Sequence, residues 1–236
     1  MAVLLESNAP RICKDDFDKE ATLFLEQYYP EALRQPMAVP ILQIARQKMG
    51  LRVVERRLSE DFSILGQMCF TTGLAEIYDK DNDEYREVKA RYGTMIIDPD
   101  TIAKRNEGCK NNTIAHECFH WHKHRDYHIA ASVVDKTKTR IRSPYKEYTE
   151  SPRDDWSDED WMEWQANGIA PRILMPLEQF NIMVERFLDD YTSNPIIRRK
   201  WYSLHRWVVN STAIFFKVSK QSAEIRLEET GYYLRE

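Results

Sequence analysis

His116-Glu117-Cys118-Phe119-His120 lies inside an apolar run that begins at Thr113, and the rest of the chain is organised around this stretch. Side chains four positions apart on a helix share one face, so His116 and His120 can reach one metal ion. Glu117 falls on the flank of that face, where it can accept a proton from a metal-bound water. The spacing therefore predicts a catalytic zinc site. The alternative is a helix that carries two histidines and no metal.

The composition sets the broad class of the protein. Its 236 residues are enough for one domain, or a closely packed pair, with a substantial core. The formal net charge of −4 gives no overall attraction to nucleic acid or anionic lipid. No apolar stretch approaches the length of a membrane span, no secretion signal is recognisable, and the four cysteines form no Cys-x-x-Cys pair. We therefore expect a cytoplasmic protein with reduced thiols and no membrane partner.

The first half of the chain changes from helical to β-type patterns. Apolar residues recur at helical spacing over 14–29 and 40–50. Residues 51–99 hold short β-rich runs between polar turns, which predicts a small, largely antiparallel sheet in an α+β fold. The last of these runs, 94–97, is the most apolar. The helix with the histidines is then expected to begin with one of three caps, Asn111, Asn112 or Thr113.

After His124 the pattern weakens, and residues 126–155 are interpreted as an inserted segment. Strand character is expected within it at 132–134 and 140–142. A helix then begins at Ser157, where Ser157 and Asp160 resemble a capping box. The remaining helices are expected at 177–189, at 196–216 and from a cap at Ser219 through 229.

A catalytic zinc ion takes three protein ligands and keeps one open position, so the histidine pair needs a third ligand. His124 shares a similar helical face with His116, but eight residues of helix separate the two by about 12 Å, too far to share one ion. A metzincin would place a histidine at position 126, which is Asp126 here. His122 and His128 lie off the face or beyond the expected helix end. We expect these three additional histidines on a wet surface beside the metal.

Glu163 is the better candidate for the third ligand, because it lies on a second helix that can pack across the first. Asn167 follows four residues later on the same face. Its amide oxygen could accept the outer N–H of a zinc-bound imidazole and so fix the orientation of the ring. The alternative is a solvated glutamate on an amphipathic helix, and spacing alone does not separate the two interpretations.

Three motifs occur in order along the chain. They are Thr113-Ile114-Ala115-His116-Glu117-x-x-His120 with His124 four residues on, then Glu163-x-Gln165-Ala166-Asn167 leading into Ile173-Leu174-Met175-Pro176, and finally Phe216-x-Val218-Ser219-x-x-Ser222-Ala223-x-x-Arg226-Leu227. With these motifs the chain resembles the ImmA/IrrE family of metallo-endopeptidases over most of its length from about residue 40. It departs from the family's usual pattern at Phe119, where glycine is common, at Pro171, in the long gap before Glu163 and in its aromatic tail.

The resemblance implies a zincin-like fold in which His116, His120 and Glu163 hold one zinc ion and Glu117 is the general base. It implies a peptidase domain over 1–190 and a helix-turn-helix-like C-terminal region over 191–236, packed on the first. Members of the family known by function cleave helix-turn-helix repressors of stress or mobile-element genes. The resemblance therefore also implies a protein substrate of that kind.

The sequence thus predicts zinc-dependent hydrolysis of a peptide bond in a protein. An extended substrate could add to a strand edge formed by Thr94, Met95, Ile96 and Ile97, and the alternative is that this strand is simply part of the core. A second donor to the oxyanion is also expected. Four residues remain open for that role: Tyr127, His128, Tyr148 and His205.

A second function remains open, which is a zinc-containing regulatory or binding module that does not cut. Its contacts with DNA would come from 218–231, which has the small-residue pattern of a helix-turn-helix-like element. Lys217, Lys220 and Arg226 could then meet phosphates. The plainer interpretation of these three cations is a solvated helix face.

Overall fold

A computed structural model describes residues 9–101, 106–134, 140–144, 156–201 and 203–233. Its strands are β1 (Arg52–Glu55), β2 (Ile64–Cys69), β3 (Gly73–Asp79), β4 (Glu84–Ala90), β5 (Thr94–Ile97) and β6 (Arg140–Pro144). Four of them form a mixed sheet in the order β1-β5-β2-β6, in which only β1 and β5 are parallel. β3 and β4 form a separate antiparallel hairpin. The prediction of an α+β fold with a small, largely antiparallel sheet is confirmed.

The prediction that residues 94–97 offer a strand edge to a substrate is wrong. Both sides of β5 are already paired, with β1 on one side and β2 on the other. All four residues, Thr94, Met95, Ile96 and Ile97, are buried. The apolar run reflects a central strand covered on both faces, so its backbone groups are not free to bind an extended peptide.

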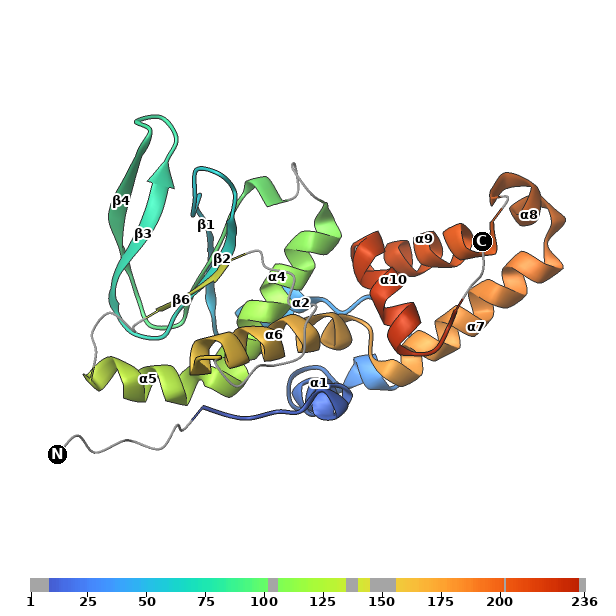
Figure 1. Ribbon diagram of the computed structural model, residues 1–236, viewed down its shortest axis with the longest axis horizontal. Helices are drawn as coiled ribbons and strands as arrows, with labels where there is room; N and C mark the ends of the chain where they lie inside the picture. Colours follow the sequence, from blue (N-terminus) through green and yellow to red (C-terminus); the bar gives the residue numbers. More distant parts are fainter. Residues whose placement is uncertain (1–8, 102–105, 135–139, 145–155, 202, 234–236) are drawn as a thin grey trace.

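Helices cover the sheet and extend away from it. They are α1 (Phe17–Tyr28), α2 (Ile41–Gln43), α4 (Glu107–Phe119), α5 (Arg125–Val134), α6 (Asp158–Leu174), α7 (Leu177–Ser193), α8 (Pro195–Trp201), α9 (Leu204–Phe216) and α10 (Lys220–Glu229). Short helical turns are η1 (Lys14–Asp16), η2 (Pro30–Leu33), η3 (Ile44–Lys48) and η4 (His120–His124). Figure 1 shows the sheet and hairpin at one end, α7–α10 at the other, and α1, α4 and α6 between them. Among the described residues, no helix has both the length and the apolar character to cross a membrane.

The helix that carries the histidines begins earlier than predicted. Asn106 is its cap, and the Asn106 side chain accepts a hydrogen bond from the backbone N–H of Cys109 at 2.8 Å. In the first turns of α4 the buried residue is Gly108, which packs against the backbone of Val218 and Ser219. A glycine adds nothing to an apolar pattern, so the sequence did not indicate helix there. A Cβ atom on Gly108 would lie 2.1 Å from the backbone carbon of Val218, so only glycine allows the C-terminal region to approach this closely.

Two other predicted segments differ from the structure. Residues 132–134 are the end of α5 and not a strand, because the helix continues without a break from the turn η4 despite the β-branched side chains. The predicted helix 196–216 is two helices, α8 and α9, and Ser203 starts the second by accepting from the N–H of Arg206. The predicted caps at Ser157 and Ser219 and the strand at 140–142 are confirmed.

One apolar core connects the N-terminal, central and C-terminal helices. Its members include Phe24 of α1, Phe119 of α4, Ile173 of α6, Phe180 of α7 and Phe216 of α9, all of them less than 2% exposed. This core runs across residue 190: α9 packs on α7 and α10, and α10 packs on α6, the helix that carries Glu163. The positions of the metal-site helices therefore depend on the C-terminal region.

Arg226 does not face solvent, so it fits neither interpretation left open by the sequence, a contact with DNA phosphates or a solvated helix face. The Arg226 side chain is 2% exposed and donates to both carboxylate oxygens of Asp18, at 3.1 Å for Nη1. Arg172, whose side chain is 6% exposed, lies 3.5 Å from Asp18 and 2.9 Å from Glu229. These ion pairs tie α1, α6 and α10 together.

Asp18→Ala should lower the free energy of unfolding by about 3 kcal/mol, because it leaves two buried guanidinium groups with Glu229 as their shared carboxylate. Urea denaturation of the metal-free protein measures this loss. Asp15→Ala is the matched control, since Asp15 is an exposed acid one turn earlier. Equal stabilities of the two variants would show that the ion pairs contribute nothing.

Candidate metal centre

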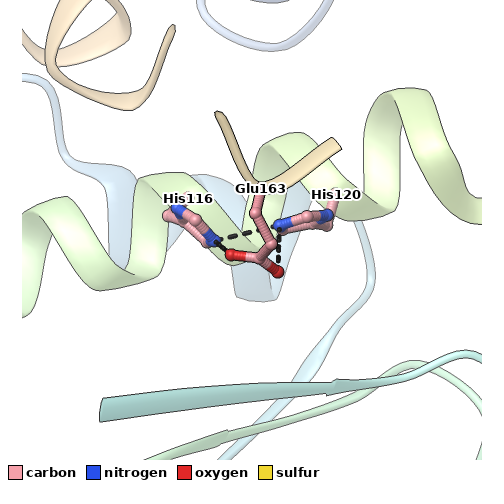
Figure 2. A group of neighbouring side chains, drawn as sticks. All are labelled: His116, His120 and Glu163. Atoms are coloured by element: carbon pink, nitrogen blue, oxygen red, sulfur yellow. Dashed lines mark hydrogen bonds and ion pairs between the residues drawn. The ribbon is translucent and has the colours of Figure 1, made fainter. Parts of the chain in front are cut away.

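His116 and His120 lie where α4 passes into η4, and the helix presents both rings on the same face. The two Nε2 atoms are 2.9 Å apart. His116 is 4% exposed and His120 is fully buried. Figure 2 shows both rings pointing to the side from which Glu163 approaches.

Glu163 comes from α6, which packs across α4. Its Oε2 lies 3.3 Å from Nε2 of His116, and its Oε1 lies 3.3 Å from Nε2 of His120 (Figure 2). Within the described ranges, His116, His120 and Glu163 are the group of His, Cys, Asp and Glu side chains whose donor atoms lie close enough to hold a metal ion. The interpretation of Glu163 as a solvated glutamate is wrong, because it is 6% exposed.

The donor set fits a small divalent cation. Ligand atoms about 2.0–2.1 Å from a tetrahedral ion lie about 3.3 Å from one another, close to the spacing of these three groups. The Asn167 side chain helps to raise the pKa of His116, and Nε2 of that ring faces His120 and Glu163. Two imidazole nitrogens and a carboxylate are ligands that zinc accepts, and three protein ligands leave one position open for a water or substrate.

The three ligands also perturb one another's protonation. Burial alone would favour the neutral acid, but His120 and His116 hold the pKa of Glu163 well below its ordinary value. Burial disfavours a charged His116 ring, yet the Glu163 carboxylate outweighs this and raises the pKa of His116 above 6.5. Burial lowers the pKa of His120. In the metal-free centre, His116 is therefore the group that holds a proton which a metal ion must displace.

Zinc affinity should weaken by about tenfold per pH unit as the pH falls below the raised pKa of His116, because one proton is released for each ion bound. Glu163 adds no proton to this exchange because it stays ionised. Competition with a chromophoric chelator between about pH 5.5 and 7.5, corrected for protonation of the chelator, measures the slope. An affinity that is independent of pH would contradict proton displacement at the ligands.

Glu117 is fully buried and lies beside Gly66 of β2. A Cβ atom on Gly66 would come within 2.5 Å of Oε1 of Glu117 and 2.8 Å of Cγ2 of Thr113. Sequence reasoning missed this residue, although a glycine inside an apolar strand is a known sign of close approach by another group. Gly66 leaves the space that the Glu117 carboxylate occupies.

Gly66→Ala should lower kcat/KM by about 100-fold by displacing the Glu117 carboxylate, with zinc affinity unchanged because no metal ligand moves. Gly73→Ala is the matched control, since a Cβ there meets nothing within 4 Å. Peptidase assays and zinc titrations on both variants make the comparison. If Gly66→Ala loses zinc binding as well as activity, the effect is not specific to Glu117.

The histidines expected on a wet surface are largely buried. His124 is 0% exposed and His128 is 2% exposed, so the prediction is wrong for both. His128 stacks on Phe70 with ring centroids 4.5 Å apart. His122 is partly buried, and its Nδ1 lies 3.4 Å from the hydroxyl of Tyr28.

The four residues proposed as oxyanion donors lie in different places. Burial, together with a hydrogen bond to Asp158, raises the pKa of Tyr127 to about 12. His128 is buried against Phe70 of the sheet region. His205 lies on α9, where its Nε2 is 3.2 Å from Glu224. Tyr148 lies outside the described residues, so these contacts do not select one donor.

Two comparisons with known proteins bear on this arrangement. Residues 102–228 match the sequence model of the Peptidase_M78 family, described as the IrrE N-terminal-like domain. The matched range covers more than half of the chain and contains all three candidate ligands and Glu117. No curated protein matches the chain.

Proposed function

Because the chain belongs to the Peptidase_M78 family of IrrE N-terminal-like domains, we propose that it is a zinc-dependent endopeptidase that hydrolyses a peptide bond in a protein substrate. The observation that carries this proposal is the convergence of His116, His120 and Glu163 from two helices, with Glu117 next to the first histidine. The zincin-like fold implied by the resemblance is consistent with the α+β architecture and with the family match.

Each residue has a role in this proposal. His116, His120 and Glu163 would hold the ion, and Asn167 would orient the ring of His116 by accepting its outer N–H. A bound zinc ion would polarise the scissile carbonyl and lower the pKa of water towards about 7. Glu117 accepts the proton of the attacking water and passes it to the leaving amine. Gly66 keeps the space in which that carboxylate sits.

We propose a helix-turn-helix repressor as the substrate, on the family resemblance. The best test uses a repressor encoded by a neighbouring reading frame, mixed with the zinc-loaded protein and with protein treated with a chelator. Mass spectrometry should find one pair of complementary fragments that needs zinc and is absent with Glu117→Gln. Cleavage that persists in both controls would refute the proposed mechanism, and cleavage of a different protein partner would refute only the substrate.

The alternative of a DNA-binding module has less support than the peptidase. Of the three cations proposed to meet phosphates, Arg226 is buried in ion pairs, while Lys217 and Lys220 are exposed. No disulfide bond forms among the described cysteines, and we propose that the protein acts in the reducing cytoplasm. Steeply salt-dependent DNA binding without proteolysis would favour the alternative.

A further inference from the structure

His124 contacts a metal ligand although it is too far along the helix to be one itself. The turn η4 is a π-helix, in which each residue turns through a smaller angle than in an α-helix. His124 follows His120 by four positions, so the two side chains lie on the same face of this turn. Their Nδ1 atoms are 3.0 Å apart, and their ring centroids are 4.9 Å apart. His120 makes this contact with Nδ1, whereas its Nε2 faces Glu163.

The direction of this hydrogen bond follows from a chain of contacts behind the two rings. Nε2 of Gln165 donates to the carbonyl oxygen of Pro10 at 2.8 Å, and a carbonyl can only accept. The amide orientation of Gln165 is thereby fixed, and its Oε1 faces Nε2 of His124 at 3.1 Å. Since an amide oxygen can only accept, the proton of His124 is on Nε2.

A neutral imidazole with its proton on Nε2 carries a lone pair on Nδ1. Nδ1 of His124 therefore accepts, and Nδ1 of His120 donates across the 3.0 Å contact. The remaining lone pair of His120 is then on Nε2, the atom that lies 3.3 Å from Glu163. All of these polar atoms are buried or partly buried, which limits competition from water.

We propose that His124 is a positioning residue of the metal centre, which accepts the Nδ1 proton of His120 and so turns the Nε2 lone pair of His120 toward the ion. Gln165 and the Pro10 carbonyl hold His124 in the tautomer that this requires. The inference rests on the proposed function in so far as the ion is zinc. It also connects the centre to the N-terminal segment, where Arg11 donates to Asp158 at 2.8 Å and lies over the Trp161 ring.

Zinc affinity of the full chain tests the proposal without any substrate. His124→Phe keeps an aromatic ring but removes the acceptor, and should weaken zinc binding by about 10–100-fold. His124→Asn, whose amide oxygen can accept from His120, should recover much of this loss. His122→Phe is the matched control two residues away, since His122 contacts Tyr28 and not the centre, and should bind zinc as the wild type does.

A spectroscopic measurement separates positioning from a general structural role. Long-range ¹H–¹⁵N correlation spectra of the wild-type protein should show the proton of His124 on Nε2, both with and without zinc. Gln165→Leu should leave a mixture of the two tautomers, because the acceptor on Nε2 is gone. A proton on Nδ1 of His124 in the wild-type protein, or wild-type zinc affinity in His124→Phe, would overturn the proposal.

These outcomes also distinguish the inference from the proposed function. Wild-type protein that binds zinc but cuts no protein would refute the peptidase and leave the His124 contact intact. If the His124→Phe variant cuts its substrate at the wild-type rate at limiting zinc concentration, the inference is refuted and the peptidase proposal stands. Thermal unfolding of the metal-free variants shows whether His124→Phe destabilises the fold. If His124→Asn recovers zinc affinity while unfolding at the same temperature as His124→Phe, lost stability does not explain the weaker binding.

Discussion

Glu117→Gln should lower kcat/KM for the protein substrate by about 10²–10⁴-fold, the range expected when a general base is removed. Glutamine has nearly the same size as glutamate, so the packing against Gly66 is retained. Its amide cannot accept the proton of the attacking water. Zinc affinity should stay within about threefold of wild type, because Glu117 is not in the group of three candidate ligands.

The control for this variant is Glu107→Gln, which changes an exposed glutamate on the same helix. It should retain full activity and full zinc binding. Single-turnover cleavage with excess enzyme measures the chemical step apart from product release. If Glu117→Gln binds zinc normally and cuts at the wild-type rate, Glu117 is not the base, and the proposed mechanism is wrong.

Glu163→Gln should weaken zinc binding by more than about 100-fold, because it replaces a charged ligand with a neutral amide. Mutating a residue that only supports a ligand typically lowers metal affinity by about 10–100-fold, so loss of the ligand itself should cost more. The two histidines would then face an amide in place of the carboxylate that lies 3.3 Å from each of them. Activity at a fixed, limiting zinc concentration should fall with the occupancy of the site. Chelator competition measures the affinity directly.

Glu159→Gln, one turn earlier on α6, is the control for this second change. It should bind zinc as the wild type does. Excess zinc separates occupancy from chemistry, since it should restore part of the activity of Glu163→Gln but none of that of Glu117→Gln. If Glu163→Gln keeps the wild-type affinity, the carboxylate is not a ligand and the third ligand must be sought elsewhere.

The parts of the site that follow from local spacing could be predicted from the sequence. The positions of His116, Glu117 and His120 on one helix follow from helical periodicity, and the cap at Ser157 follows from the residue three positions later. The pairing of Glu163 with the histidines depended on the motif resemblance, because no local rule brings residues 43 positions apart together.

Non-local contacts explain what sequence reasoning missed. Strand order depends on pairing between distant segments, so the apolar run 94–97 indicated burial on both faces but not that β1 and β2 pair with both edges of β5. The spacing of four residues accounts for the contact between His124 and His120, but the groups behind His124, Gln165 and the Pro10 carbonyl, come from distant segments, so its burial was not expected. Arg226 looked like a surface cation because its partner, Asp18, is far away in the sequence.

The most direct test of the central claim is anomalous diffraction at the zinc absorption edge from crystals of the zinc-loaded protein. The account predicts one strong peak about 2.0–2.2 Å from Nε2 of His116, Nε2 of His120 and a carboxylate oxygen of Glu163. A fully loaded protein whose zinc peak lies elsewhere, with these three side chains holding no ion, would contradict it.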